Sequence, residues 1–165
     1  MKLKDTARCG ICAALICICA WLSVPFGDIA LTLQGFGIFL SLLLLGGGKG
    51  SASCGVYLLL GAVGLPVFSG FRGGLGILIG PTGGYLWGYL LGCLLFWLLE
   101  KRLPLWVLLI LVQLICYLWG TVWFYFAYAH GGLLPVILKC VVPYLVPDGC
   151  KIAFAWLLSR RLRWL

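Results

Sequence analysis

The stretch "LPLWVLLILVQLICYLWGTVWFYFAYA", residues 103–129, contains no aspartate, glutamate, lysine or arginine. A helix of about 20 apolar residues spans the hydrocarbon core of a bilayer, so this run is long enough to cross a membrane. Four further uncharged runs precede it, at residues 9–27, 29–48, 50–71 and 73–99. The sequence therefore predicts an all-α integral membrane protein that crosses the bilayer several times.

The composition of the 165-residue chain agrees with this prediction, because 64% of it is hydrophobic and only 10% is charged. A soluble domain of this length needs far more polar surface. Lys2, Lys4 and Arg8 precede the first apolar run, as basic residues do in a signal peptide. No small-x-small cleavage site closes that run, so we expect it to be retained. We treat residues 1–165 as a single membrane-embedded domain.

Six transmembrane helices are expected, with a broken or re-entrant segment before the last. Pro135, Pro143 and Pro147 interrupt residues 131–147, where we expect this short or re-entrant piece. The last helix should begin at Pro147, because a proline in the first helical turn lacks only an N–H that has no partner there. The expected helices are residues 8–24, 29–46, 51–66, 81–100, 104–128 and 147 to about 159.

The distribution of basic residues predicts the orientation of these helices. If the N-terminus is cytoplasmic, nine of the twelve lysines and arginines lie on the inner side, and Arg72, Lys139 and Lys151 lie on the outer side. This satisfies the positive-inside rule and predicts a multi-pass protein of the bacterial inner (plasma) membrane with both termini cytoplasmic. The net charge of +8 is then explained by topology and by contact with anionic lipid, not by nucleic-acid binding.

The polar and aromatic residues that can contact a ligand fall in the outer half of this arrangement. The strongest local signal is "PDGCK", residues 147–151, where Asp148 and Lys151 share one helix face. Two interpretations are open: the two charges pair with each other, or they bind a ligand such as a cyclic urea. In the second case the urea N–H groups would donate to the carboxylate, and its C=O would accept from the ammonium. The candidate substrate-binding residues are Thr32, Gln34, Phe68, Gly70, Arg72, Tyr85, Trp123, Asp148 and Lys151.

Each of the other candidates also has a structural alternative. Thr32 and Gln34 either join helices by hydrogen bonds or contact the ligand. Arg72 is either an interfacial anchor or the partner of a ligand carboxylate. The aromatic residues 123–128 form either an interfacial belt or an apolar wall of the site.

The glycine-rich stretch at residues 67–88 is expected to connect two helices on the outer side. It is either a tight turn or a loop that closes over the site, and Pro81 should begin the helix that brings Tyr85 to the ligand.

Small residues recur every four positions near the N-terminus. Cys9, Ala13 and Cys17 form one row, and Gly10 and Ala14 form a second row beside it. Such spacing lets another helix approach closely. The approaching helix either belongs to the same chain or to a separate membrane partner, and these five residues are the candidate docking surface.

No catalytic or metal-binding set is evident in the sequence. His130 is the only histidine, and Asp28 is the only other acid expected on the outer side with Asp148. We therefore expect no metal, no cofactor and no enzymatic activity. The segment "GGGKGS", residues 46–51, lacks the first glycine and the final serine or threonine of a phosphate-binding loop, so we interpret it as a turn between helices.

Five short segments together resemble the BioY family, the biotin-binding S components of energy-coupling factor (ECF) transporters. The resemblance covers roughly residues 28–165. The segments are "TLQ" (32–34), "GLPVFSG" (64–70), "GGLG" (73–76), "GPTGGYL" (80–86) and "VPDGCK" (146–151).

The resemblance implies six helices, capture of biotin on the extracytoplasmic side, and partnership with a transmembrane coupling subunit and two ATPase subunits. It assigns Asp148 and Lys151 to the ureido ring of biotin. It also implies that the small-residue rows on the first helix dock the coupling subunit, although Cys9 and Cys17 stand where the family generally has alanine. The alternatives are transport of a different vitamin, a solitary carrier, an intramembrane lipid-modifying enzyme, or a structural subunit without a ligand.

Overall fold

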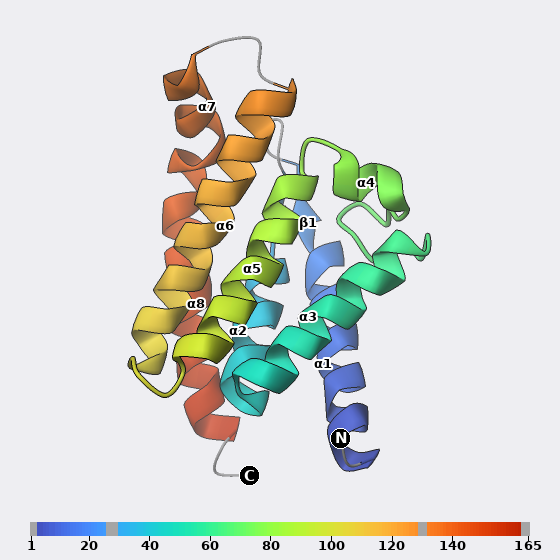
Figure 1. The fold of residues 1–165 in the computed structure, drawn as a ribbon, viewed down its shortest axis with the longest axis vertical. Coiled ribbons are helices and arrows are strands. Elements are labelled where there is room, and N and C mark those ends of the chain that lie inside the picture. Colours follow the sequence, from blue (N-terminus) through green and yellow to red (C-terminus); the bar gives the residue numbers. More distant parts are fainter. Residues whose placement is uncertain (1–2, 26–29, 129–131, 163–165) are drawn as a thin grey trace.

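The computed structural model describes residues 3–25, 30–128 and 132–162, and these residues are mostly helical (Figure 1). Asp28 and His130, considered above, lie outside the described residues. The helices are α1 (Leu3–Trp21), α2 (Gln34–Leu45), α3 (Gly47–Ala62), α4 (Leu75–Ile79), α5 (Gly83–Leu99), α6 (Leu105–Tyr128), α7 (Leu133–Cys140) and α8 (Val142–Leu162). The strands are β1 (Ser23–Val24) and β2 (Leu31–Thr32).

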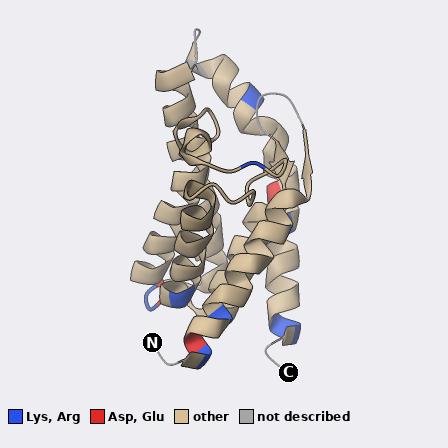
Figure 2. Cartoon of the chain, turned by 90° about the vertical axis from the view of Figure 1, so that its right-hand side faces the viewer, with Lys and Arg blue, Asp and Glu red and all other residues tan. Residues whose placement is uncertain are grey.

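The helices form one bundle in which α1 begins at the same end of the molecule at which α8 finishes (Figure 1). The most extensive contact joins α5 to α6, while α2 packs against α1, α3 and α8. Two stretches, Leu105–Tyr128 and Leu134–Leu162, are long and apolar enough to cross a membrane by length and composition. Basic residues lie mainly at the end of the bundle where α1 begins, and few charged residues lie along its middle (Figure 2).

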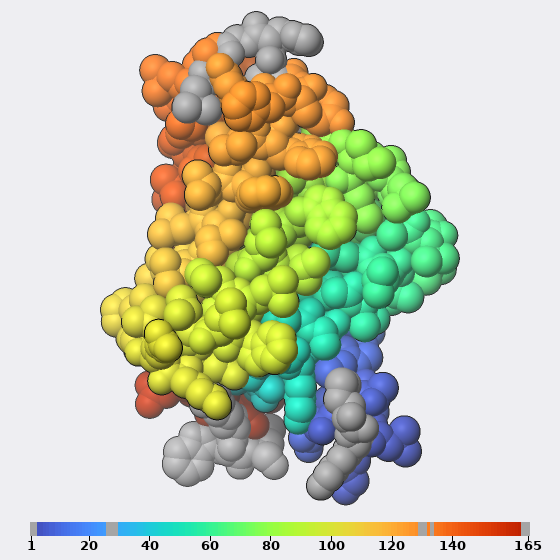
Figure 3. All heavy atoms as spheres, in the orientation of Figure 1, coloured from blue at the N-terminus to red at the C-terminus, as the bar shows by residue number. Residues whose placement is uncertain are grey.

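Large apolar side chains cover the outside of the bundle as well as its core. Phe39, Tyr57 and Leu108 are fully buried, whereas Leu118 and Phe126 are 68% and 81% exposed. The side chains of α5 and α6 form one continuous face of the molecule (Figure 3). An exposed apolar surface of this extent requires an apolar environment, as a membrane provides.

The first two helices differ from the expected ones at their outer ends. α1 runs from Leu3 to Trp21, and α2 begins only at Gln34, because β1 and β2 between them form an antiparallel ribbon. In this ribbon Ser23 pairs with Thr32, and the Leu33 N–H donates to the Leu22 carbonyl over 3.0 Å. The prediction that Thr32 lies in a helix is therefore wrong, because strand pairing supplies its backbone partners instead.

The expected turn at residues 46–51 is reduced to Gly46, whose φ of +79° suits glycine. α3 begins at Gly47, and the Gly47 N–H donates to Glu100 Oε2 over 2.6 Å. Glu100 thus satisfies one of the first N–H groups of α3, which have no partner within the helix. The prediction that the whole segment is a turn is wrong, because a carboxylate from the end of α5 allows the helix to start earlier.

The connection from α3 to α5 contains a short helix, α4, that was not predicted. Phe68 and Arg72 form an isolated antiparallel bridge, and Gly70 lies at the turn between them with φ +71°. α5 begins at Gly83, so the prediction that Pro81 begins this helix is wrong. Three aromatic side chains, one from α1 and two from α6, hold the connection by donating to its backbone carbonyls. These bonds are Trp21 Nε1 to Pro66 (2.7 Å), Trp123 Nε1 to Gly80 (3.2 Å) and Tyr128 Oη to Ile79 (2.5 Å).

The segment before the last helix is an eight-residue helix, α7. This helix ends at Val141, whose backbone is not helical. α8 begins at Val142 and continues to Leu162, so Pro147 lies inside it. The predicted start at Pro147 is wrong because Pro143, the second residue of α8, already occupies the position in the first turn that suits proline.

Two glycines on one face of α5 allow its backbone to approach that of α6. A Cβ added to Gly88 would lie 2.9 Å from the Cα of Cys116, and one added to Gly92 would lie 3.0 Å from the Cα of Val112. Side chains at these positions would separate the two helices. The glycine spacing therefore determines how closely the polar residues of α5 and α6 face each other.

Candidate ligand-binding site

A cavity of about 80 Å³ lies between α2, α5, α6, α8 and the connection from α3 to α5. Most of its lining is apolar or aromatic, and its polar groups converge from β2, from four helices and from the connection between α3 and α5. The polar and phenolic lining residues are Thr32, Gln34, Ser69, Thr82, Tyr85, Tyr89, Gln113, Tyr117, Tyr144, Asp148 and Lys151.

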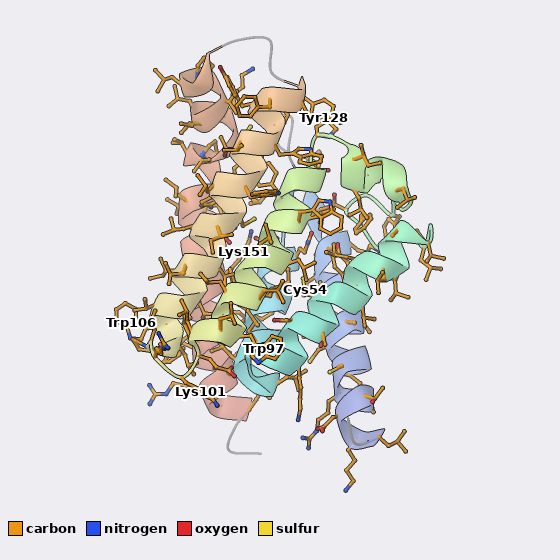
Figure 4. All side chains as sticks on the ribbon, in the orientation of Figure 1. Cys54, Trp97, Lys101, Trp106, Tyr128 and Lys151 are labelled. Atoms are coloured by element: carbon orange, nitrogen blue, oxygen red, sulfur yellow. The ribbon has the colours of Figure 1, made fainter. Side chains whose placement is uncertain are left out.

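Asp148 and Lys151 form an ion pair on one face of α8. Lys151 Nζ lies 2.5 Å from Asp148 Oδ1, and the two residues are only 8% and 5% exposed. Lys151 lies at mid-height of the molecule, whereas Lys101 lies at its lower end (Figure 4). A buried ion pair is stable only when further hydrogen bonds satisfy the charged groups.

Two side chains of α6 supply these further hydrogen bonds. Gln113 Nε2 and Tyr117 Oη donate to Asp148 Oδ2 over 2.8 and 2.5 Å. Tyr89 Oη of α5 donates in turn to Gln113 Oε1 over 3.2 Å. The carboxylate therefore accepts from three donors, and its Oδ2 atom is fully occupied by α6.

Gln113 and Tyr117 were not among the predicted site residues. A signal for them was present, because Gln113 is the one amide side chain within residues 103–129, and Tyr117 follows it after one helical turn. Polar side chains inside a membrane-spanning helix usually face the interior of the bundle. That rule would have placed both residues opposite α8.

Gln34 reaches the cavity from the first turn of α2. It is 6% exposed, and its Nε2 has no hydrogen-bond partner within the part of the chain that the structure describes. α2 comes close to α5 here, because a Cβ on Gly35 would lie 2.6 Å from Tyr89 Oη. Thr32 lines the cavity beside Gln34, although it does so from β2.

The cavity is covered on one side by the connection from α3 to α5. Phe68 and Ser69 of this connection line the cavity, and Phe68 packs edge-on against Tyr57 with ring centroids 5.5 Å apart. Tyr85 lines the cavity from α5, and its hydroxyl lies 3.5 Å from Thr121 Oγ1. Phe68 and Tyr85 were both among the predicted residues.

Three predicted residues do not line this cavity. Arg72 is exposed, and its Nε donates to the Ser69 carbonyl over 3.2 Å. Gly70 is exposed in the same turn. Trp123 of α6 does not line the cavity, and its Nε1 donates a hydrogen bond to the Gly80 carbonyl. All three lie in or against the connection that covers the cavity.

The two small-residue rows of α1 have different environments. Cys9, Ala13 and Cys17 are buried within the chain, and the Cys9 thiol donates to the Lys49 carbonyl of α3 over 3.5 Å. This row packs against helices of the same chain, which is one of the two alternatives considered above. Gly10 and Ala14 are exposed.

Comparison with known proteins gives a consistent result over the whole chain. A family model described as the BioY family matches residues 1–165. The "Biotin transporter BioY" of Thermotoga maritima is 46% identical over 100 residues, which are 61% of this chain and 59% of that protein. The "Probable biotin transporter BioY" of Pyrococcus horikoshii is 34% identical over 163 residues, which are 99% of this chain and 98% of that protein.

A solved structure is also similar to this fold. It is the crystal structure of the S-component for biotin from an ECF-type ABC transporter, with a TM-score of 0.86 and 30% sequence identity. The match covers 99% of this chain and 93% of the other.

Proposed function

Because this chain belongs to the BioY family, we propose that it is the substrate-binding S component of an ECF-type transporter and that its substrate is biotin. The names of its relatives and of the similar solved structure support transport of biotin, and none of those names describes an enzyme. The observation that carries the proposal within this chain is the buried Asp148–Lys151 pair, which stands in a small polar cavity.

The chemistry of biotin fits this cavity. Its ureido ring has two N–H donors and one carbonyl acceptor, and a buried carboxylate such as Asp148 is a strong partner for N–H donors. Its fused rings are apolar, in keeping with the aromatic and aliphatic part of the lining. Its carboxylate tail is directed to the outer side, where Arg72 is available beside Ser69 of the cavity wall.

Binding of a whole biotin molecule requires the cover of the cavity to move. Pockets for drug-sized ligands usually have volumes of about 300–1,000 Å³, whereas this cavity has about 80 Å³. The connection that carries Phe68 and Ser69 is the mobile cover in this proposal. Three of the hydrogen bonds that hold it to the bundle are side-chain donors to backbone carbonyls, and these bonds open without unfolding a helix.

In the proposed topology, α1, α2, α3, α5, α6 and α8 cross the bacterial cell membrane, and α7 is the interrupted segment before α8. Both termini are cytoplasmic, and the cavity opens toward the extracytoplasmic side. The gathering of basic residues at one end of the bundle supports this orientation. ATP hydrolysis belongs to two separate ATPase subunits, and a transmembrane coupling subunit connects them to this chain.

Biotin should stabilise the purified protein in detergent and release or absorb heat on titration. A ligand present at 100 times its Kd raises the free energy of unfolding by about 2.7 kcal/mol if it binds only the folded state. Isothermal titration and a thermal melt with and without biotin measure this, with riboflavin and thiamine as control ligands. The absence of both heat and stabilisation with biotin would contradict the proposed substrate.

Changing Ala14 to tryptophan should prevent assembly with the coupling subunit while leaving biotin affinity unchanged. The exposed Gly10–Ala14 row is the part of the small-residue pattern that remains accessible, and a bulky side chain there keeps a second helix away. Co-purification with the coupling subunit measures assembly. The matched control is Gly55→Trp on α3, where an added Cβ meets nothing within 4 Å. An intact complex with the Ala14 variant would show that this row is not the docking surface.

A further inference from the structure

A groove lies beside the ligand cavity, between the β1–β2 ribbon, the end of α1, α2 and α8. Its volume is about 730 Å³, and most of its lining is apolar. Thr32 and Lys151 line both the groove and the ligand cavity, so they form part of the wall between the two. The other main lining residues of the groove are Trp21, Val24, Leu33, Phe36, Cys150 and Phe154.

The groove is continuous with the exposed apolar surface of the membrane-spanning helices. Phe154 of α8 is 60% exposed, and its ring packs against that of Phe36 of α2 with centroids 5.4 Å apart. Phe154 belongs to the stretch Leu134–Leu162, which is long and apolar enough to cross a membrane. At the other end of the groove, Trp21 is of the residue type that favours the membrane–water interface. The groove therefore opens toward the acyl chains of the bilayer.

The charge of the groove disfavours an anionic occupant. Among the described residues that line it, Lys151 is the one charged side chain, and its ammonium is already neutralised by Asp148 at 2.5 Å. A carboxylate inside the groove, such as that of a free fatty acid, would lose its hydration without gaining a cation. A phospholipid avoids this cost, because its headgroup stays at the interface while one acyl chain lies in the groove.

We infer that one acyl chain of a membrane phospholipid resides in this groove, in the leaflet nearer to the cover of the ligand cavity. The groove offers the chain no hydrophobic gain, because lipid tails are as apolar as the lining. The attraction is one of packing: a concave wall contacts the chain on several sides, and an unfilled groove would lose those dispersion contacts. This inference does not depend on which substrate the protein transports.

The resident chain also supports the cover of the ligand cavity through Trp21. This side chain lines the groove, and its Nε1 donates to the Pro66 carbonyl over 2.7 Å. Its ring stacks on Phe71 with centroids 5.2 Å apart. Pro66 and Phe71 both belong to the connection from α3 to α5, so a chain packed against Trp21 steadies a side chain that fastens this connection.

Photo-crosslinking of the protein in vesicles tests the inference. The vesicles consist of phosphatidylethanolamine and phosphatidylglycerol, with a small share of phosphatidylcholine that carries a diazirine in one acyl chain. Crosslinks mapped by mass spectrometry should concentrate on Phe36, Cys150 and Phe154, and be several-fold rarer on Leu118 of α6, which is 68% exposed. Crosslinks distributed in proportion to exposure would overturn the inference. A groove labelled only by a free diazirine fatty acid, or crosslinked to a second copy of the chain, would also overturn it.

Cys150→Trp tests the same groove by filling it from α8. Cys150 is exposed, so the larger side chain can enter the groove without displacing the core. Crosslinking to Phe36 and Phe154 should fall several-fold in this variant. The matched control is Leu157→Trp, on the same helix at a position that is 61% exposed and does not line the groove, and it should leave this crosslinking unchanged.

Removal of lipid by detergent gives a second measurement on the same variants. It should lower the melting temperature of the unchanged protein and of Leu157→Trp by a few degrees, because the groove loses its chain. Cys150→Trp should be lowered less, since the indole ring takes the place of the chain. Equal loss of crosslinking in the two tryptophan variants, or equal shifts of their melting temperatures, would show that the groove holds no resident chain.

Discussion

Replacing Lys151 with methionine should abolish detectable biotin binding and lower the free energy of unfolding by about 3–5 kcal/mol. That is the usual effect of removing one partner of a buried ion pair, because the remaining charge is left without compensation. Asp148 would keep its bonds from Gln113 and Tyr117, but these are neutral donors. Titration with biotin and denaturant unfolding in detergent measure the two effects.

The chain provides a matched control for this variant. Lys49 and Asp5 form an ion pair with a distance of 2.7 Å, but their side chains are 41% and 21% exposed. Lys49→Met should therefore change stability by at most about 1 kcal/mol and leave biotin binding intact, as is typical of surface pairs. If the two methionine variants behave alike, the burial of the Asp148–Lys151 pair has no special energetic role.

A double variant, Asp148→Leu with Lys151→Met, separates stability from binding. Apolar replacement of both partners of a buried ion pair is often neutral or stabilising. Gln113 and Tyr117 would lose their acceptor, which limits the recovery. We expect most of the stability to return while biotin binding stays absent. Recovery of biotin binding in the double variant would show that the pair does not contact the ligand.

Replacing Gly88 with leucine should prevent the protein from accumulating in a folded form. Its Cβ alone would lie 2.9 Å from the Cα of Cys116, so α5 and α6 would have to move apart. Overpacking of this kind costs about 1–3 kcal/mol, and more when backbone atoms are the obstacle. Separation of α5 from α6 would also pull Tyr89 away from Gln113. Yield of monodisperse protein and biotin binding by the remaining fraction measure the effect.

Gly55→Leu is the control for the size of the introduced side chain. Gly55 lies within α3, and a Cβ there meets nothing within 4 Å. Leucine also favours a helix more than glycine does by about 0.5–1 kcal/mol. This variant should express and bind biotin normally. A folded, binding-competent Gly88 variant would show that close contact between α5 and α6 is not needed to form the cavity.

The helical, membrane-embedded character of the chain follows from its charge-free runs, but the ends of the helices do not. The length of a charge-free run indicates whether that segment can lie in an apolar environment. A helix, in contrast, ends where its last backbone N–H and C=O groups find other hydrogen-bond partners. The pairing of residues 23–24 with 31–32 shortens α1 and α2, and the carboxylate of Glu100 starts α3 at Gly47. These partners are distant in sequence, so no local pattern contains them.

Six of the nine predicted residues line the cavity, namely Thr32, Gln34, Phe68, Tyr85, Asp148 and Lys151. Asp148 and Lys151 were found because their spacing places them on one helix face. Gln113 and Tyr117 were missed although the one amide side chain in residues 103–129 was a sequence signal for the buried face of that helix. Arg72 was predicted from its charge and its glycine-rich surroundings, and both also suit an exposed turn.

The location of both charges on α8 also affects the insertion of this helix into the membrane. Because Asp148 and Lys151 are three residues apart, they can neutralise each other within an isolated helix, before any other helix is present. Each unpaired charge at the centre of a membrane helix opposes insertion by about 2.5–3.5 kcal/mol. Intrahelical neutralisation lowers this barrier during biosynthesis, and α6 completes the hydrogen bonding afterwards, when the helices assemble.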